Sequence, residues 1–178
     1  MRIAPLAAND ESLYCELYTD VRLMRHVGMA LQREQAERSF RAAVVASHDR
    51  PPRHIYFSLV HGATNWSAGI CALRDIDLSE RCAEIGLILR RRAHATGAAR
   101  EGLEAVASWA FSELGLARLY GRASADNLAA ARVARLAGFS LVRPAAEGAA
   151  ASMSLFVRFR ATSETCNSHQ GVSHVQSY

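Results

Sequence analysis

The sequence predicts an α/β fold in which a mixed, mostly antiparallel sheet of about seven strands is flanked by about four helices. Apolar runs of strand length follow one another between residues 55 and 90, separated by short polar connections, as in an antiparallel meander. Beyond residue 90, two segments with apolar residues at helical spacing alternate with further strands. The first pattern predicts the antiparallel half of a sheet, and the second predicts a mixed sheet that carries helices.

The first half of the chain is expected to begin with a strand and two helices. Asn9, Asp10 and Glu11 supply a polar cap before a short helical pattern. Pro51 and Pro52 end a clearer amphipathic helix, because proline cannot continue one. In order, we expect a strand within 1–6, a helix after residue 11, a turn or broken helix over 20–28, a helix over 33–47, strands over 55–60 and 66–73 joined by a turn, and a charged connection over 74–81.

The second half is expected to alternate strands and helices. An apolar strand over 83–90 leads through a small-residue turn into a helix in which Leu103, Val106 and Phe111 recur at helical spacing. Gly115 ends this helix, and Asn127 starts the last one. Further strands are expected over 117–123, 139–142 and 153–160, the last two joined by a loop over 144–151. Residues 161–178 are polar without an apolar period, which predicts a disordered tail after a single domain of residues 1–160.

The composition is typical of a cytoplasmic globular protein. Of 178 residues, 50% are hydrophobic and 21% are charged, and no apolar run approaches the roughly 20 residues that cross a bilayer. The start of the chain lacks the apolar stretch of a secretory signal. The four cysteines, Cys15, Cys71, Cys82 and Cys166, show no metal-ligand spacing. We therefore expect reduced thiols, no metal, no membrane association and a cytoplasmic location.

The net charge of +4 comes from arginine, much of it around the turn that follows the strand over 83–90. These basic residues are not interleaved with aromatic residues, so nucleic acid binding is not expected. Gly97, Ala98 and Ala99 are small enough for a phosphate to approach the backbone N–H groups at the start of a helix. The turn therefore predicts an anion site, with an ordinary strand–helix unit as the alternative.

Four stretches carry a recognisable pattern: Ala83-Glu84-Ile85-Gly86, the segment 97–111, the segment 114–119 followed by Asn127 to Phe139, and Met24-Arg25-His26-Val27-Gly28. Together they resemble the GNAT N-acetyltransferase superfamily, in particular its ribosomal-protein N-terminal acetyltransferase subgroup. They occur in the family's order and cover roughly residues 1–160. The resemblance implies the GNAT fold and transfer of an acetyl group from acetyl-CoA, as co-substrate, to an amine.

The resemblance also implies which residues bind acetyl-CoA. A backbone N–H of the central strand, around Leu87 to Leu89, would stabilise the oxyanion. The family's pyrophosphate loop normally begins with Gln or Arg, and His94 stands there in this chain. The implied cofactor-binding residues are Leu87, Ile88, Leu89, Arg91, Arg92, His94, Ala95, Thr96, Gly97, Ala98, Ala99, Arg100, Asn127 and Arg132.

Three residues are candidates for proton transfer. Glu84 on the central strand is either the general base or a strand carboxylate paired with an arginine. Tyr120 and Ser124, on or just after the next strand, are candidate donors to the departing thiolate, although Tyr120 also suits simple packing. Many family members carry a tyrosine as general acid where this chain has Ala134.

The predicted function is N-acetyl transfer to a primary amine, either a protein or peptide α-amino group or a small-molecule amine. The alternative is a non-catalytic acyl-CoA-binding regulatory module, which the residues at His94 and Ala134 would suit. The expected assembly is a monomer or a homodimer.

Overall fold

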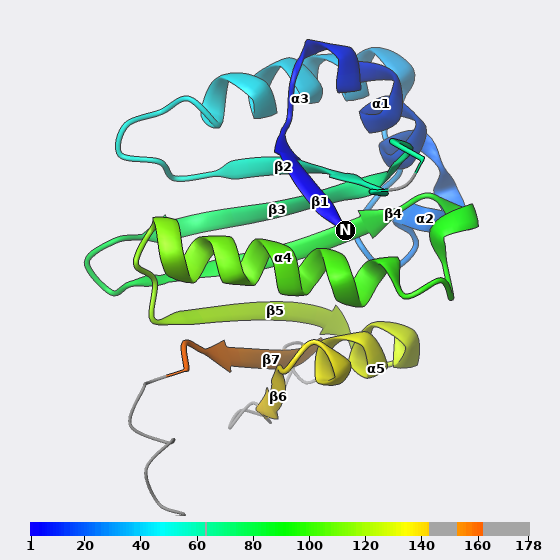
Figure 1. The fold of residues 1–178 in the computed structure, drawn as a ribbon. Helices are drawn as coiled ribbons and strands as arrows, with labels where there is room; N and C mark the ends of the chain where they lie inside the picture. Colours follow the sequence, from blue (N-terminus) through cyan, green and yellow to red (C-terminus); the bar gives the residue numbers. More distant parts are fainter. Residues whose placement is uncertain (63, 143–152, 162–178) are drawn as a thin grey trace, which may run out of the picture.

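A computed structural model of the protein describes residues 1–62, 64–142 and 153–161. Its centre is one seven-stranded sheet in the order β1-β2-β3-β4-β5-β7-β6 (Figure 1). The strands are β1 (Arg2–Pro5), β2 (Ile55–Val60), β3 (Ser67–Asp77), β4 (Cys82–Leu89), β5 (Arg118–Ser124), β6 (Ser140–Val142) and β7 (Met153–Phe159). The predicted fold class, a mixed and mostly antiparallel sheet, is confirmed.

Helices cover both faces of this sheet. One group is α1 (Glu11–Thr19), α2 (Val21–Met24) and α3 (Arg33–Ala46); the other is α4 (Ala98–Glu113) and α5 (Leu128–Leu136), with short 3-10 turns η1 (Ala8–Asp10) and η2 (Arg91–Ala93). Leu13, Phe40 and Ile88 belong to a core that joins α1 and α3 to the sheet, whereas Ile85 and Val106 belong to a larger core under α4. Successive residues of β4, such as Ile88 and Leu89, thus face opposite layers, as the pleat of a strand requires.

The pairing of β4 with β5 is the one parallel contact in the described sheet, and it is short. Only three residue pairs are matched, from Cys82 with Arg118 to Glu84 with Tyr120. Beyond them β4 continues to Leu89 and β5 to Ser124 without pairing to each other. On the side of β4 that faces β5, backbone groups are therefore left without a strand partner.

Two segments differ from the sequence expectation. The charged connection expected over 74–81 is wrong in its first part, because β3 runs on to Asp77, with Leu73 and Ile76 buried. A register shift and a positive φ of 48° at Asp75 displace its apolar residues from strict alternation, which hides the strand in the sequence. The ambiguous stretch over 20–28 holds the short helix α2, which the Asp20 carboxylate caps by accepting from the backbone N–H groups of the next turn.

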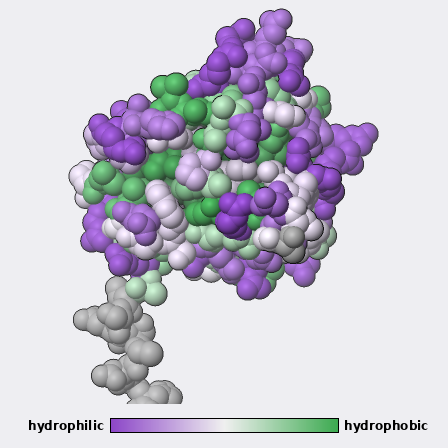
Figure 2. Space-filling model, turned by 45° about the horizontal axis from the view of Figure 1, so that its top comes forward, coloured by the Kyte–Doolittle hydropathy of each residue, from purple (hydrophilic) through white to green (hydrophobic). Residues whose placement is uncertain are grey.

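Within the described residues, no helix is long and apolar enough to span a membrane. The face in Figure 2 carries hydrophilic side chains along much of its margin, with hydrophobic side chains between them. The thiols of Cys15, Cys71 and Cys82 are free. Cys166, the loop expected over 144–151 and, apart from residue 161, the tail expected over 161–178 lie outside the described residues.

Candidate active site

A cavity of about 340 Å³ opens where β4 and β5 separate. Its strand walls are Ile85, Gly86, Leu87 and Leu89 on one side and Gly121, Arg122 and Ala123 on the other. The turn before α4 and one side of α5 complete it, with His94, Ala95, Ala99, Leu103, Asn127, Ala129, Ala130, Val133, Ala134, Phe139 and Phe156. The cavity is mostly apolar and bounded by the unpaired side of β4, as is typical of a small-molecule site.

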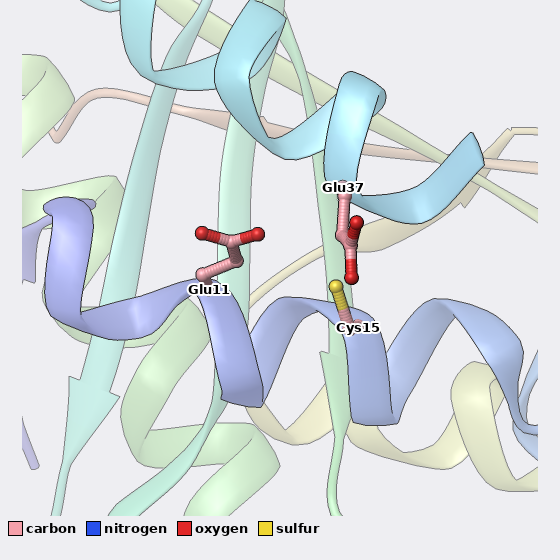
Figure 3. A group of neighbouring side chains, drawn as sticks. All are labelled: Glu11, Cys15 and Glu37. Atoms are coloured by element: carbon pink, nitrogen blue, oxygen red, sulfur yellow. The ribbon is translucent and has the colours of Figure 1, made fainter. Parts of the chain in front are cut away.

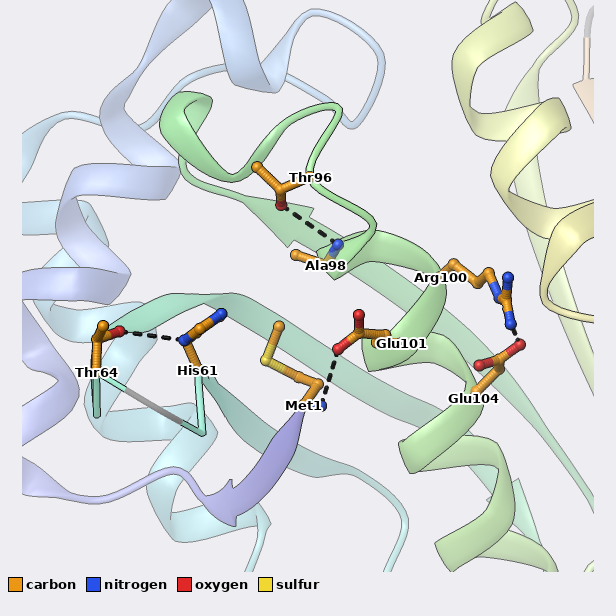
Figure 4. Close-up of polar contacts among 8 residues, drawn as sticks. All are labelled: Met1, His61, Thr64, Thr96, Ala98, Arg100, Glu101 and Glu104. Carbon is orange, nitrogen blue, oxygen red and sulfur yellow. Dashed lines mark hydrogen bonds and ion pairs between the residues drawn. The ribbon is translucent and has the colours of Figure 1, made fainter.

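The turn at one end of this cavity presents the N-terminus of α4. Gly97 caps the helix with a φ of +88°, and Ala95 also has a positive φ, of 60°. The Thr96 hydroxyl donates to Ala93 O at 2.8 Å. It also accepts from Ala98 N at 3.4 Å (Figure 4). Because the first N–H groups of a helix have no intrahelical acceptor, this turn offers donors and a positive dipole end to an anion.

The arginines around the turn are mostly engaged with other side chains. The Arg92 guanidinium lies 3.8 Å from the centre of the Trp66 ring. Arg90 binds the Glu16 carboxylate, with the shortest contact at 2.6 Å, and Arg100 pairs with Glu104 at 2.9 Å. In Figure 4, Arg100 points away from the turn toward Glu104. Arg91 and Arg132 are exposed and line no part of the cavity. These side chains therefore leave the backbone N–H groups of the turn as its main hydrogen-bond donors toward the cavity.

Asn127 and His94 support the cavity from its two sides. The Asn127 carboxamide oxygen accepts from Ala130 N at 3.0 Å and so caps α5, while the residue also lines the cavity. The His94 ring contacts Leu89 O at 3.2 Å, which ties the turn to the end of β4. Ala134 adds only a methyl group to the cavity wall.

Glu84 lies next to the point where the strands part, on the face of β4 opposite to Ile85. It is 7% exposed. Arg74 Nη2 donates to its Oε1 at 2.7 Å, and Arg122 Nη2 donates to its Oε2 at 2.8 Å. Both carboxylate oxygens are thus engaged by guanidinium groups, which is the paired arrangement that the sequence left open beside the role of base.

Tyr120 and Ser124 share the face of Glu84. Burial, and then the nearby carboxylates of Glu84 and Asp75, raise the pKa of Tyr120, so its hydroxyl stays protonated at neutral pH. The Ser124 hydroxyl donates to the Asp126 carboxylate, and this hydrogen bond lowers the pKa of Asp126. His26 Nδ1 lies 3.7 Å from the same carboxylate.

The sequence over residues 1–140 matches the family model of the acetyltransferase (GNAT) domain. The chain belongs to the GNAT acetyltransferase family. The match confirms both the predicted superfamily and the predicted enzyme class, an acyltransferase. A search of the curated proteins found no match.

Solved GNAT structures share this fold over nearly their whole length. Spermidine N-acetyltransferase from Vibrio cholerae, in complex with CoA and spermine, has a TM-score of 0.74 and 18% identity, covering 89% of this chain and 94% of that chain. An acetyltransferase from Agrobacterium tumefaciens has a TM-score of 0.72 and 23% identity, covering 89% and 90%. RimL, a ribosomal L7/L12 α-N-protein acetyltransferase in complex with coenzyme A, has a TM-score of 0.70 and 15% identity, covering 89% and 98%.

The predicted cofactor-binding residues of this GNAT domain divide into three groups. Six line the cavity: Leu87, Leu89, His94, Ala95, Ala99 and Asn127. A second group lies outside the lining, with Arg132 exposed on α5 and the rest in or next to the turn before α4: Arg91, Arg92, Thr96, Gly97, Ala98 and Arg100. Ile88 belongs to the opposite core. Arg122 was not predicted, although its spacing of two from Tyr120 on one strand places both side chains on one face.

A separate group of possible metal ligands lies away from this cavity. Figure 3 shows Glu11 and Cys15 on α1 facing Glu37 on α3, with their ligand atoms within 4.8 Å of one another. The Glu37 carboxylate already accepts from Arg33 Nε at 2.8 Å. The Arg33 guanidinium therefore already supplies a cation to this cluster, and no other observation on these three residues indicates a bound ion.

Proposed function

We propose that the protein transfers the acetyl group of acetyl-CoA to a primary amine by direct attack. The observation that carries this proposal is the cavity between the separating ends of β4 and β5, with the N-terminus of α4 at its end. In the reaction the amine nitrogen forms a bond to the thioester carbonyl carbon, the carbon–sulfur bond breaks, and the thiolate takes up a proton. Holding the two reactants together supplies several kcal/mol of such a barrier.

Acetyl-CoA would lie along the unpaired side of β4. The backbone N–H groups of the turn over 95–100 would hold its diphosphate, and Asn127 and the small Ala134 would face its pantetheine arm. When bound, acetyl-CoA supplies the activated acyl group. Alternate N–H groups of β4 beyond Glu84 have no strand partner on the β5 side and are the candidate oxyanion donors.

Three side chains would act on the amine and the leaving thiolate from the face of the sheet opposite to α4, next to the point where β4 and β5 part. They are Glu84, Arg122 and Tyr120. The amine must be neutral to attack, and an α-amino group with a pKa near 8 loses its proton more readily than lysine at about 10.4. Tyr120, with its raised pKa, is a protonated group that can donate to a thiolate. Glu84 is either the base or the residue that fixes Arg74 and Arg122 in place.

The acceptor is a peptide or protein α-amino group or a small-molecule amine. The residue pattern favours the α-amino group, since it resembles the ribosomal-protein subgroup, and RimL shares the fold. The polyamine enzyme of Vibrio cholerae shares the fold equally well, so the fold does not fix the acceptor.

The test measures release of free thiol from acetyl-CoA with a panel of peptides and small amines. We expect acceptor-dependent release in the wild type and a loss of about 100-fold in Glu84→Gln, with Glu113→Gln at the far end of α4 as the matched control. Calorimetry with CoA confirms that each variant still binds. If Glu84 is the base, the acidic limb of the pH profile of kcat/KM disappears in Glu84→Gln; if it only positions the arginines, the limb remains.

Binding of acetyl-CoA without turnover on any amine would contradict an acetyltransferase and favour the regulatory module. No binding at all would contradict the assignment of the cavity.

A further inference from the structure

A second cavity, of about 560 Å³, lies on the face of the sheet opposite to α4. Residues of β5 and β7 line it: Arg118, Tyr120, Arg122, Met153, Ser154, Leu155 and Val157. Tyr120 pairs with Val157 and Arg122 with Leu155 across the two strands, so these side chains share one face. The floor is therefore apolar and aromatic, and the rim is cationic.

This second cavity adjoins the acetyl-CoA cavity. Arg122 lines both of them, one on each side of the sheet. Gly121, between Tyr120 and Arg122, faces the first cavity, and a Cβ there would lie only 3.3 Å from Ile85 O on β4. The second cavity thus lies on the face of the sheet opposite to α4, next to the point where β4 and β5 part, and shares Arg122 with the first cavity.

The charges around the second cavity favour an anion. Arg118 is exposed, and Arg122 keeps 52% of its side chain exposed although it holds Glu84. Among the described residues, no carboxylate lines the cavity. Glu84 is buried between two guanidinium groups, and Asp75, the other carboxylate near Tyr120, lies outside the lining.

Such a rim suits some amine acceptors and repels others. A guanidinium group presents several N–H donors in a plane, and one that holds Glu84 through Nη2 still has others to offer a carboxylate or phosphate. A polyamine would instead bring its ammonium groups against two like charges, with no carboxylate among the described lining residues to receive them. The cavity therefore selects by charge.

We propose that this protein acetylates an amine that also carries an anionic group, and that Arg118 and Arg122 bind that group in the cavity between β5 and β7. This inference rests on the proposed acetyltransferase function and names its class of acceptor. Among α-amino groups it selects peptides with an acidic residue next to the N-terminus. Among small molecules it selects amino acids and phosphorylated amines, and it excludes polyamines.

The test compares kcat/KM for amidated peptides Ala-X-Gly-Tyr, in which X is Glu, phosphoserine, Gln or Lys, together with spermidine. We expect the two anionic peptides to exceed the Gln peptide at least tenfold, with the Lys peptide and spermidine slower still. The ratio of kcat/KM for the Glu peptide to kcat/KM for the phosphoserine peptide shows whether the cavity prefers a carboxylate or a phosphate. Arg118→Glu should abolish this preference, and Arg38→Glu, the same charge change on exposed α3, should keep it.

Calorimetric binding of the Glu peptide gives a second readout, which should weaken at least tenfold in Arg118→Glu only. A circular dichroism melt establishes that the variant is folded. Equal kcat/KM for the Glu, Gln and Lys peptides would overturn the anionic acceptor and leave the acetyltransferase standing, whereas no thiol release with any amine would overturn both. Loss of a dimer in Arg118→Glu with an unchanged acceptor preference would also overturn the proposal, since the cavity would then be a subunit interface.

Discussion

Gly97 is the residue on which the anion-binding turn depends most directly. Its φ of +88° lies in the left-handed region, where a Cβ costs roughly 1–2 kcal/mol. In Gly97→Ala the turn must either keep that strain or rotate its peptide groups toward negative φ, which would redirect the N–H donors. We expect the dissociation constant for acetyl-CoA, measured by calorimetry, to rise about tenfold.

Gly115→Ala is the matched control for this variant. Gly115 also has a positive φ, of 64°, and a Cβ there would meet nothing within 4 Å. Both substitutions should lower the free energy of unfolding by about 1 kcal/mol, but only Gly97→Ala should weaken binding. Equal effects on binding would mean that the turn at Gly97 acts through stability and does not touch the ligand.

Single residues of the site were predictable where they belong to a linear motif. Ala99 and Asn127 follow from the turn and cap pattern of the sequence, His94 follows from the resemblance to the family's loop, and all three line the cavity. The surroundings of Glu84 did not follow, because Arg74 and Arg122 approach it from two different strands. A contact between residues ten and 38 positions apart is set by sheet register, which the sequence order alone does not give.

Among the elements, the contact of β3 with β4 holds the edge on which the cavity forms. Gly69 on β3 pairs with Leu89, and a Cβ at Gly69 would lie 2.8 Å from Leu89 Cα and closer still to Ile88 O. Those atoms are backbone and cannot rotate away, so Gly69→Ala must push the two strands apart. We expect a loss of about 3 kcal/mol of unfolding free energy, measured in urea.

Gly62→Ala, in the turn between β2 and β3, tests whether this loss is local. A Cβ at Gly62 would meet nothing within 4 Å, so its midpoint in urea should stay close to that of the wild type. Similar urea midpoints for Gly69→Ala and Gly62→Ala would contradict this prediction. They would mean that β3 and β4 can move apart at Gly69 without loss of stability.

The elements themselves followed from the periodicity of the sequence more fully than their ends did. The predicted helix over 33–47 corresponds to α3, and the predicted strand over 55–60 corresponds to β2. The continuation of β3 through Arg74 and Asp75 was missed, because two consecutive exposed charged residues resemble a loop. Their exposure comes from a local irregularity in pairing with β4, which no composition signal reveals.

At the scale of the whole molecule, the cavity lies at the seam between two parts of the sheet. The antiparallel strands β1 to β4 and the strands β5 to β7 are joined through only three paired residues of β4 and β5. The cores on the two faces and the packing of α4 must hold these parts together beyond that point. The second part of the sheet depends on β7, which pairs with both β5 and β6.

The end of the domain can therefore be located by two truncations. The backbone N–H of Arg160 donates to Ala117 O at 2.9 Å, which fastens the chain just after β7. A chain of residues 1–161 should melt within about 2 °C of the full protein and bind acetyl-CoA equally well, because the described fold is then complete.

A chain of residues 1–152 loses β7, with Phe156 only 2% and Val157 only 9% exposed. Burial of such side chains is worth about 1.5–3 kcal/mol each, a large part of a domain's whole stability, so this chain should not fold. Circular dichroism measures both melts, and a large drop in the melting temperature of the 1–161 chain would place the domain boundary beyond residue 161.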